Sequence, residues 1–399
     1  NSSDMPQKVA IWLLVLNMGC GTVGTTIISP ALSSITEHFS VEESDSQSLL
    51  SGYFISLAVF QLFYGVLSDR YGRRRPLFFG LAILALGGLI AALAESFETL
   101  ILARILQGLG AASVYSIIRA IINDCYGRLE GASALALITG IMLVVPICSF
   151  AFGGLITDLV SWRGIMLGIF LAGLVPLVLN MILLPETNLQ PLKRVELRNF
   201  TRDYLALMTN RSFLAFMLAS ACCVGIWFTM IGFIPFEYQR IGVNTAEVGF
   251  WFMFSPIGFA LGNFLTKHLV HQLGLERMAQ LGGVLSVFAI SALLLPSLLS
   301  VSHPILIGIP SFFFGFSAGF IMATTTMGAI SSAGELGGSA SGIVGATQMG
   351  FGVLGGAMVV GVGGYEQFEK GVAVLIGLAV LSTLFSTFAK HLGKPSRAV

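Results

Sequence analysis

Long runs of apolar residues, separated by short polar segments, fill almost the whole chain. A helix that crosses the hydrocarbon core of a bilayer needs about 20 predominantly apolar residues. Runs of this length predict twelve membrane-spanning helices, over residues 9–33, 47–67, 76–95, 98–122, 131–157, 162–184, 212–236, 246–268, 276–298, 304–328, 338–361 and 371–391. The pattern therefore predicts an all-α membrane protein.

One long polar segment interrupts this series and divides the predicted helices six and six. Its part from Val195 to Met208 has the pattern of a basic amphipathic helix, which would lie along the cytoplasmic face of the membrane. We expect three parts: a six-helix bundle over residues 1–184, a linker with this amphipathic helix over residues 185–210, and a second six-helix bundle over residues 211–399.

The positions of the basic residues predict the orientation, because positively charged loops stay in the cytoplasm. If both termini are cytoplasmic, the outer side receives only Arg163, Arg240 and Lys370 of the 21 Lys and Arg residues, and nearly all others fall inside. We therefore expect a multi-pass protein of the cytoplasmic (inner) membrane with both termini in the cytoplasm.

Composition supports a membrane protein and narrows its function. Of the residues, 55% are hydrophobic and only 10% are charged, against about 25% charged in ordinary soluble domains. The formal net charge of +1 offers no basic face for nucleic acid. The five cysteines have no metal-ligand spacing, so neither a metal site nor a cofactor is expected.

Other classes of membrane protein are disfavoured by what the sequence lacks. An enzyme needs a nucleophile, a metal cluster or paired carboxylates at membrane depth, and none can be assembled from these residues. A channel is expected to show rings of like residues or a filter sequence, and neither is found. We therefore expect a monomeric carrier of a small-molecule substrate, surrounded by lipid, that is not an enzyme.

The segment between the second and third predicted helices carries a specific motif. It reads Gly-Val-Leu-Ser-Asp-Arg-Tyr-Gly-Arg-Arg-Arg-Pro over residues 65–76. This resembles the major facilitator signature G-x-L-a-D-r-x-G-r-R, and the preceding Tyr53 and Gln61 make it similar to the Bcr/CflA branch of drug:proton antiporters. The resemblance implies twelve helices in two bundles and transport by alternating access, with substrate near the membrane midplane between the bundles.

In this family the motif latches the two halves together on the cytoplasmic side. Glycines allow a tight turn there, Asp69 can cap a helix N-terminus, and Arg73 can pair with that aspartate. The resemblance implies a conformational latch of six residues: Gly65, Asp69, Arg70, Gly72, Arg73 and Asp124. The alternative is that the arginines only fix the topology.

Two further segments agree with the resemblance. The run from Leu102 to Ala112 is similar to the second family motif and includes Arg104 and Gly108. In the fifth predicted helix, a helix-packing set of Pro146, Gly153 and Gly154 resembles the third motif, which is associated with antiporters. Phe150 stands where that branch often has a second proline.

Arg104 is the one charge plainly inside the hydrocarbon region, where a cation is functional by default and needs a partner. In the family the partner is commonly an acid on the first helix, just before a proline. Aligning Pro30 with that proline puts Thr26 at the position of the acid, and no Asp or Glu occurs between Lys8 and Glu37. The usual proton carrier is therefore absent from this helix.

Two functions remain open. The first is a proton-coupled exporter of drug-like or small metabolite molecules. The alternative is a carrier, with import as one direction, of an anionic metabolite such as a carboxylate siderophore, with Arg104 binding the anion. Arg104 can also bond only backbone carbonyls, Gln61 or water. The candidate substrate-binding residues are Arg104, Thr22, Thr25, Thr26, Tyr53, Gln61, Tyr115, Trp227 and Gln348.

Overall fold

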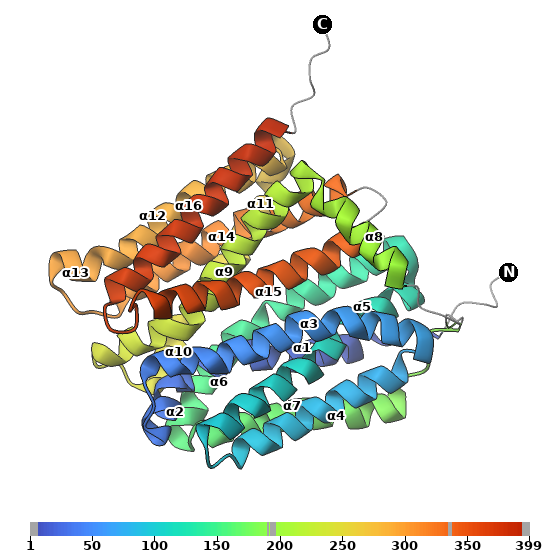
Figure 1. The fold of residues 1–399 in the computed structure, drawn as a ribbon, viewed down its shortest axis with the longest axis horizontal. Helices are drawn as coiled ribbons and strands as arrows, with labels where there is room; N and C mark the ends of the chain where they lie inside the picture. The colour runs from blue at the N-terminus through green and yellow to red at the C-terminus, as the bar shows by residue number, and fades with distance from the viewer. Residues whose placement is uncertain (1–6, 190, 192–196, 334–336, 393–399) are drawn as a thin grey trace, which may run out of the picture. The chain divides into compact units, whose positions relative to one another are not determined.

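The computed structural model describes residues 7–189, 191, 197–333 and 337–392, and every regular element in these ranges is helical (Figure 1). The chain separates into two compact units, Asn1–Val195 (unit 1) and Glu196–Val399 (unit 2). Each unit is described by itself. The three-part division predicted from the sequence differs from these units in its boundaries and stays a prediction.

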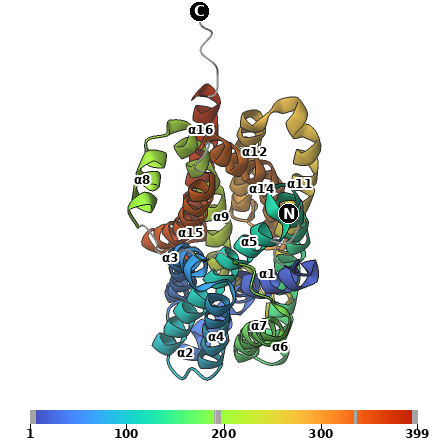
Figure 2. The ribbon, with the colours of Figure 1, turned by 90° about the vertical axis from the view of Figure 1, so that its right-hand side faces the viewer.

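Unit 1 is built from seven helices and two 3₁₀ turns within its described residues. Helix α5 is its centre, because α1, α3 and α4 pack against it, and α7 packs against α4. Figure 2 shows α6 beside α7. The elements are α1 (Ile11–Thr26), η1 (Ser29–Ala31), α2 (Leu32–Phe39), η2 (Glu43–Ser46), α3 (Gln47–Tyr71), α4 (Arg74–Ala92), α5 (Phe97–Met142), α6 (Val144–Leu159) and α7 (Trp162–Leu183).

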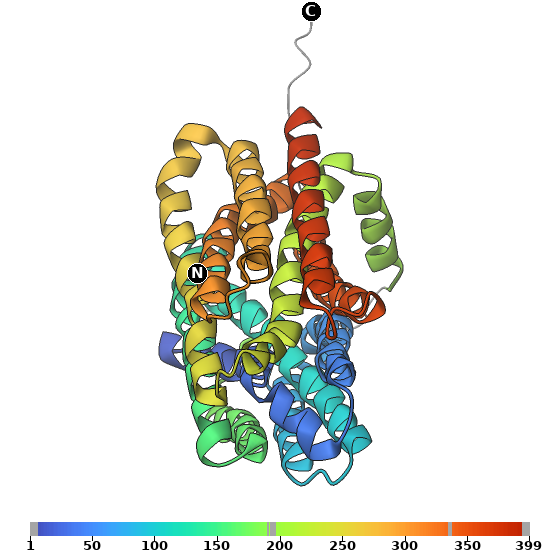
Figure 3. The same cartoon turned by 90° about the vertical axis from the view of Figure 1, so that its left-hand side faces the viewer.

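Unit 2 has nine helices and one 3₁₀ turn in the part that the structure describes. Helix α14 packs against α11, α12 and α9, whereas α16 packs against α9 and α12; α12 and α16 lie side by side in Figures 1 and 3. The elements are α8 (Leu197–Met208), α9 (Arg211–Arg240), α10 (Thr245–Phe252), α11 (Phe254–Leu273), α12 (Leu275–Ser291), η3 (Ala292–Leu294), α13 (Leu295–Leu299), α14 (Ile305–Ser332), α15 (Gly337–Gly361) and α16 (Phe368–Leu392).

The described residues contain eleven helical segments long and apolar enough to cross a membrane, together with the shorter apolar helix Val144–Leu159. The chain is thus a multi-pass membrane protein. The predicted count of twelve crossings and the cytoplasmic position of both termini remain predictions. The expected amphipathic helix is found as α8, and its predicted first residue, Val195, lies outside the described residues.

Prolines set several helix ends. A proline has no N–H to donate to the carbonyl four residues earlier, and its ring clashes with that carbonyl. Helix α1 ends at Thr26, four residues before Pro30. Helix α10 ends at Phe252, four residues before Pro256. The first predicted span is therefore longer than expected and bent, running as α1, η1 and α2 to Phe39.

The same rule accounts for a difference from the predicted elements. Two separate spans were expected over residues 98–122 and 131–157, but α5 is one continuous helix that ends at Met142, four residues before Pro146. The polar residues between the expected spans contain no proline, so nothing in the backbone forces the helix to stop there. The break falls instead within the predicted fifth span.

Glycines allow a very close helix contact in unit 2, between α11 and α14. A Cβ atom on Gly258 would lie 2.1 Å from the backbone oxygen of Phe312, and one on Gly315 would lie 2.0 Å from that of Ser255. No side chain fits at these distances. Small residues at such positions let membrane helices pack by direct backbone contact, since lipid supplies no hydrophobic force between them.

Candidate functional site

The guanidinium of Arg104, on α5, is fully buried inside unit 1. Its Nη1 donates to the carbonyl of Gly24 at 3.1 Å and to Oε1 of Gln107 at 2.9 Å. Its Nε donates to the carbonyl of Leu49 at 3.2 Å. The guanidinium carbon lies 4.2 Å from the centre of the Tyr53 ring. Neutral carbonyls and an aromatic face thus stabilise this charge.

Gln107 extends this arrangement to the rest of unit 1. Its Nε2 donates to the carbonyl of Gly87 on α4 at 3.3 Å and lies 3.8 Å from the sulfur of Met166 on α7. Arg104 and Gln107 together connect α5 to α1, α3, α4 and α7. The sequence pointed to Gln61 as a neutral partner of Arg104, whereas the structure places Gln107 in that role; its spacing of one helical turn from Arg104 is the signal that could have found it.

Two buried polar atoms in this region, Nη2 of Arg104 and Oγ1 of Thr26, have no hydrogen-bond partner among the described residues. Thr26 is the residue that stands where the family commonly has an acid, and it is buried near the end of α1. Buried polar atoms without partners are rare and costly. Both atoms are therefore places where a ligand atom or a water would be stabilised.

The other candidates of unit 1 link its helices. Thr22 donates to the carbonyl of Met18 and accepts a hydrogen bond from the Tyr115 hydroxyl at 3.2 Å, which joins α1 to α5. Thr25 donates to the carbonyl of Thr22 within α1. Gln61 is half-buried, and its backbone carbonyl accepts a hydrogen bond from Ser116, which joins α3 to α5.

The predicted latch contains an ion pair at one end of α4. Nε of Arg73 lies 2.8 Å from Oδ2 of Asp124, and Nη2 lies 3.2 Å from Oδ1. Nη1 of Arg73 donates to the Ser68 hydroxyl at 2.7 Å. The Thr187 hydroxyl donates to Oδ2 of Asp124 at 3.0 Å. The aspartate therefore connects α5 with the turn before α4 and with the segment after α7.

Glu186 is a second acid at this end of unit 1, which the sequence interpretation missed. Its Oε1 accepts from the backbone N–H of Arg73 at 2.8 Å, and its Oε2 accepts from that of Arg74 at 3.2 Å. An anion at a helix N-terminus satisfies free N–H groups and interacts favourably with the helix dipole. Glu186 thus caps α4, the role that the sequence suggested for Asp69. Its position after α7, far away in the sequence, gave no signal.

Of the remaining latch residues, the structure describes Gly72 and Arg70. Gly72 has φ of +85°, a conformation that favours glycine, and Arg70 is exposed with its guanidinium 5.1 Å from the ring centre of Tyr71. The side chain of Asp69 and the surroundings of Gly65 lie outside what the structure describes. The contacts described above for Arg73, Asp124 and Arg70 are contacts within unit 1, and the latching of two halves stays a prediction.

The helix-packing motif residues lie at close contacts. A Cβ atom on Gly108 would lie 2.3 Å from the backbone oxygen of Tyr53, and one on Gly153 would lie 2.6 Å from that of Ile27. Gly154 is buried on α6, and Pro146 marks the break between α5 and α6. Gly108 therefore keeps α5 close to α3 directly beside the Tyr53 ring that faces Arg104.

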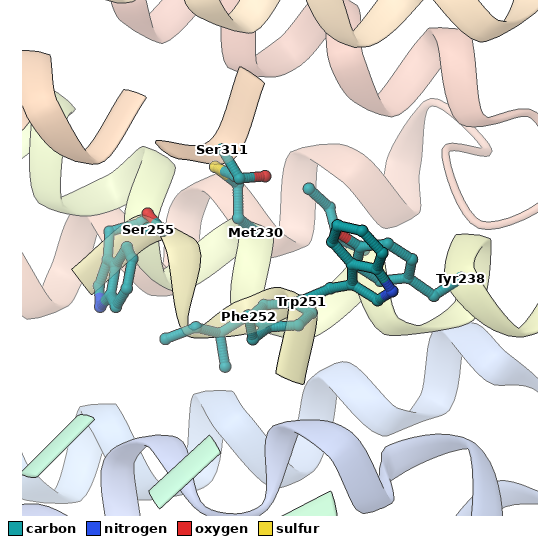
Figure 4. A pocket seen from close by; sticks show the side chains of 9 residues that line it. Met230, Tyr238, Trp251, Phe252, Ser255 and Ser311 are labelled. Atoms are coloured by element: carbon teal, nitrogen blue, oxygen red, sulfur yellow. The ribbon is translucent and has the colours of Figure 1, made fainter. Parts of the chain in front are cut away.

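A narrow aromatic pocket lies inside unit 2 (Figure 4). Its free volume of about 10 Å³ is enough for about one water molecule. The hydroxyl of Ser255, buried beside it, has no hydrogen-bond partner in the part of the chain that the structure describes. The pocket includes the candidate Trp227, and its lining residues are Trp227, Met230, Ile231, Ile234, Tyr238, Trp251, Phe252, Ser255 and Ser311.

Gln348, the other candidate of unit 2, is half-buried on α15, and its Nε2 donates to the Ser220 hydroxyl on α9. It is not among the residues that line the aromatic pocket. Trp227 and Gln348 are therefore placed in different surroundings, although both come from helices that pack on each other.

A buried amide pair in unit 1 was also missed. Asn17 on α1 donates to Oδ1 of Asn180 on α7 at 3.0 Å, and Asn180 donates back to Oδ1 of Asn17 at 2.7 Å. Both side chains are fully buried. Each asparagine lies in a mostly apolar helix, and a strongly polar side chain there is expected to face another helix. That rule could have flagged both residues, but it could not have paired them.

Comparison with known proteins identifies the family. The chain matches the sequence profile of the Major Facilitator Superfamily over residues 14–357. The chain belongs to the Major Facilitator Superfamily. It is therefore a transporter of small molecules and not an enzyme, as the motif at residues 65–76 indicated.

Relatives within the superfamily agree with the branch suggested by the sequence. The chain is 24% identical to the bicyclomycin resistance protein homolog of Haemophilus influenzae over 363 residues, which is 89% of this chain and 90% of the relative. It is 28% identical to multidrug resistance protein D of Escherichia coli over 359 residues, 86% of each chain. It is 27% identical to multidrug resistance protein MdtL of Shigella flexneri over 386 residues, 92% of each chain.

A solved structure supports the fold. The crystal structure of a bacterial homolog of the human lysosomal transporter Spinster, inward-facing and unoccupied, matches with a TM-score of 0.74 at 16% identity. The match covers 97% of this chain and 98% of that one. The major facilitator fold predicted from the motifs is thereby confirmed.

Proposed function

We propose that this transporter exports drug-like or small metabolite molecules across the cytoplasmic membrane, driven by the proton gradient and working as a monomer by alternating access. The observation that carries the proposal is the similarity, over most of both chains, to three proteins named for resistance to bicyclomycin or to multiple drugs. Resistance by a transporter requires removal of the drug from the cell.

The aromatic pocket of unit 2 supports an apolar substrate. Its walls carry two tryptophans, a tyrosine and a methionine, with serine hydroxyls as the polar groups. Such surfaces bind flat or bulky apolar molecules through area and polarizability. The pocket is too small for a drug-sized ligand as it stands, so binding requires that its walls move apart during the transport cycle.

Proton coupling has to use a different arrangement from the one common in the family. The contacts of Arg104 in the structure are carbonyls, an amide oxygen and an aromatic ring, and Thr26 cannot titrate. A carboxylate outside this cluster is therefore required. Glu237 and Asp158 lie near helix ends, whereas Asp124 lies within α5 beside Arg73; these three are the acids to test by substitution with the neutral amide.

The deciding experiment is transport by the purified protein in liposomes with an imposed pH gradient. We expect a lipophilic cationic drug or bicyclomycin to move against the proton flow, and dissipation of the gradient with a protonophore to stop it. Empty liposomes and protein with Trp227→Ala serve as controls for leak and for the aromatic pocket. Drug movement that is unaffected by the gradient would contradict proton coupling.

A second function is favoured by one observation: Nη2 of Arg104 has no hydrogen-bond partner among the described residues, whereas Nη1 and Nε of the same guanidinium do. A carboxylate substrate could supply the partner that this chain lacks, which would make the protein a carrier of an anionic metabolite such as a carboxylate siderophore. Arg104 is fully buried, so this role needs unit 1 to open. In the same liposomes, uptake of a tricarboxylate that is lost in Arg104→Gln, with no drug movement, would favour this alternative.

A further inference from the structure

An apolar groove runs along α15 and α16 on unit 2, separate from the aromatic pocket. Its volume is about 640 Å³, far larger than that of the aromatic pocket. Residues of α9, α15 and α16, and Val362 just after α15, form its walls: Leu218, Phe351, Leu354, Met358, Val362, Lys370, Ala373, Val374, Gly377, Leu378, Leu381 and Phe385. Lys370 is the only charged residue among them.

The groove belongs to helices that cross the membrane. Its walls lie on the spans Ile343–Gly361 and Phe368–Leu392, on Leu218 of α9, and on Val362 just after the first of these spans. Leu354, Met358 and Leu381 are exposed on the surface of unit 2, which is the surface that hydrocarbon covers in a bilayer. A Cβ atom on Gly377 would have nothing within 4 Å, so this glycine leaves the groove open at its middle.

The length of the groove matches one leaflet of a bilayer. On α16 it extends from Lys370 to Phe385, which is about 22 Å at 1.5 Å per residue. One leaflet with its headgroups measures about 20 to 22 Å, half of the full bilayer thickness. A phospholipid could therefore lie along the whole groove, with its headgroup at Lys370 and an acyl chain ending near Phe385.

Charges at the Lys370 end favour one kind of headgroup. Lys370 and Glu369 next to it are exposed on α16, and Glu366 is exposed in the turn that precedes this helix. Oε1 of Glu369 accepts a hydrogen bond from Ser297. The charge of Glu369 also interacts with Arg240, so Glu366 is the acid that remains for a ligand cation near Lys370. This arrangement suits a phosphate on Lys370 with an ammonium beside Glu366. We propose that the groove between α15 and α16 is a binding site for one phospholipid with an amine-bearing headgroup, such as phosphatidylethanolamine.

The test is native mass spectrometry of the full-length purified protein, to which phosphatidylethanolamine, phosphatidylcholine or phosphatidylglycerol is added. We expect one phosphatidylethanolamine to be retained in preference to the other two lipids. Lys370→Gln should lower its occupancy by about tenfold, the size of one lost charge-assisted contact. Lys370→Arg keeps the charge and should retain the lipid.

A second variant tests whether the apolar walls of the groove bind the acyl chain. Gly377→Leu fills the groove and should also reduce the bound lipid, whereas Gly168→Leu, at an equally open glycine on α7 of unit 1, should not. Equal binding of all three lipids, or unchanged binding in both Lys370→Gln and Gly377→Leu, would mean that only a non-specific lipid layer covers this surface. Mass spectrometry reads binding without transport, so the result is independent of the proposed function.

Discussion

Arg73 and Asp124 form a two-point ion pair in unit 1, with Nε of the arginine 2.8 Å from Oδ2 and Nη2 3.2 Å from Oδ1 of the aspartate. The side chains are 9% and 16% exposed. A planar guanidinium and a carboxylate match in this geometry, which an ammonium cannot reproduce. The pair fixes the turn before α4 against α5, 51 residues away in the sequence.

Breaking this pair should destabilise the protein. Asp124→Ala leaves a buried guanidinium without its main partner and should lower the free energy of unfolding by about 3 kcal/mol. The double variant Arg73→Ala, Asp124→Ala should lose less than the sum of the two single variants. Thermal unfolding of the detergent-solubilised protein measures this coupling, and strictly additive losses would show that the pair contributes nothing.

Glu186 should stabilise the N-terminus of α4, through its negative charge and through the hydrogen bonds that its two oxygens accept. Glu186→Gln keeps the size but removes the anion and one acceptor from the N-terminus of α4, with an expected loss of about 1 kcal/mol. Glu186→Ala should lose more, because both backbone N–H groups are then left without an acceptor. Hydrogen exchange at Arg73 and Arg74 is the measurement, and protection that does not change in Glu186→Ala would exclude the cap.

The aromatic ring of Tyr53 should contribute more to the stability of the protein than its hydroxyl group does. The hydroxyl lies 3.5 Å from the carbonyl of Gly21, at the limit of a hydrogen bond, so Tyr53→Phe should change stability little. Tyr53→Leu removes the aromatic face under Arg104 and should cost about 2 kcal/mol, the size of a desolvated cation–π contact. The free energy of unfolding of both variants, measured in detergent, compares them directly. Similar losses of stability for the two would mean that the ring does not stabilise the cation.

The amide pair of Asn17 and Asn180 should show coupled effects. Asn17→Leu leaves the fully buried Asn180 without its partner on α1, so the single variant should be less stable than the wild-type protein. The double variant Asn17→Leu, Asn180→Leu should recover part of the loss, with a coupling of about 1 kcal/mol for two hydrogen bonds between membrane helices. Refolding from mixed micelles is the measurement, and a double variant worse than both singles would contradict the pairing.

The contact between α11 and α14 should tolerate no Cβ atom. Gly258→Ala places one 2.1 Å from a backbone oxygen, so the two helices must separate, and we expect a sharp loss of folded protein. Gly350→Ala is the matched control, because nothing lies within 4 Å there and alanine favours a helix by up to about 1 kcal/mol. Size-exclusion profiles of the two solubilised variants are the measurement. Equal profiles would mean that α11 and α14 can separate enough to accept a Cβ atom without loss of folded protein.

The transmembrane helices and the superfamily follow from local features of the sequence. The length of an apolar run depends only on neighbouring residues, and so does the motif at residues 65–76, which is why both were predicted and the family was confirmed. The ends of α1, α5 and α10 each lie four residues before a proline, although Pro176, Pro235 and Pro310 lie inside helices that continue. The continuous α5 was missed because a polar segment was interpreted as a break, although polar residues alone do not end a helix.

The partners of the buried polar groups were decided by the tertiary structure alone. The sequence singled out Arg104 by its charge, but Gly24 and Leu49 contact it through backbone carbonyls, which every residue has and no motif marks. Glu186 meets the start of α4 from 112 residues away, and Asn17 meets Asn180 from 163 residues away. A sequence specifies that a buried polar group needs a partner, because leaving it without one is costly; which group meets that need is fixed only when the helices pack.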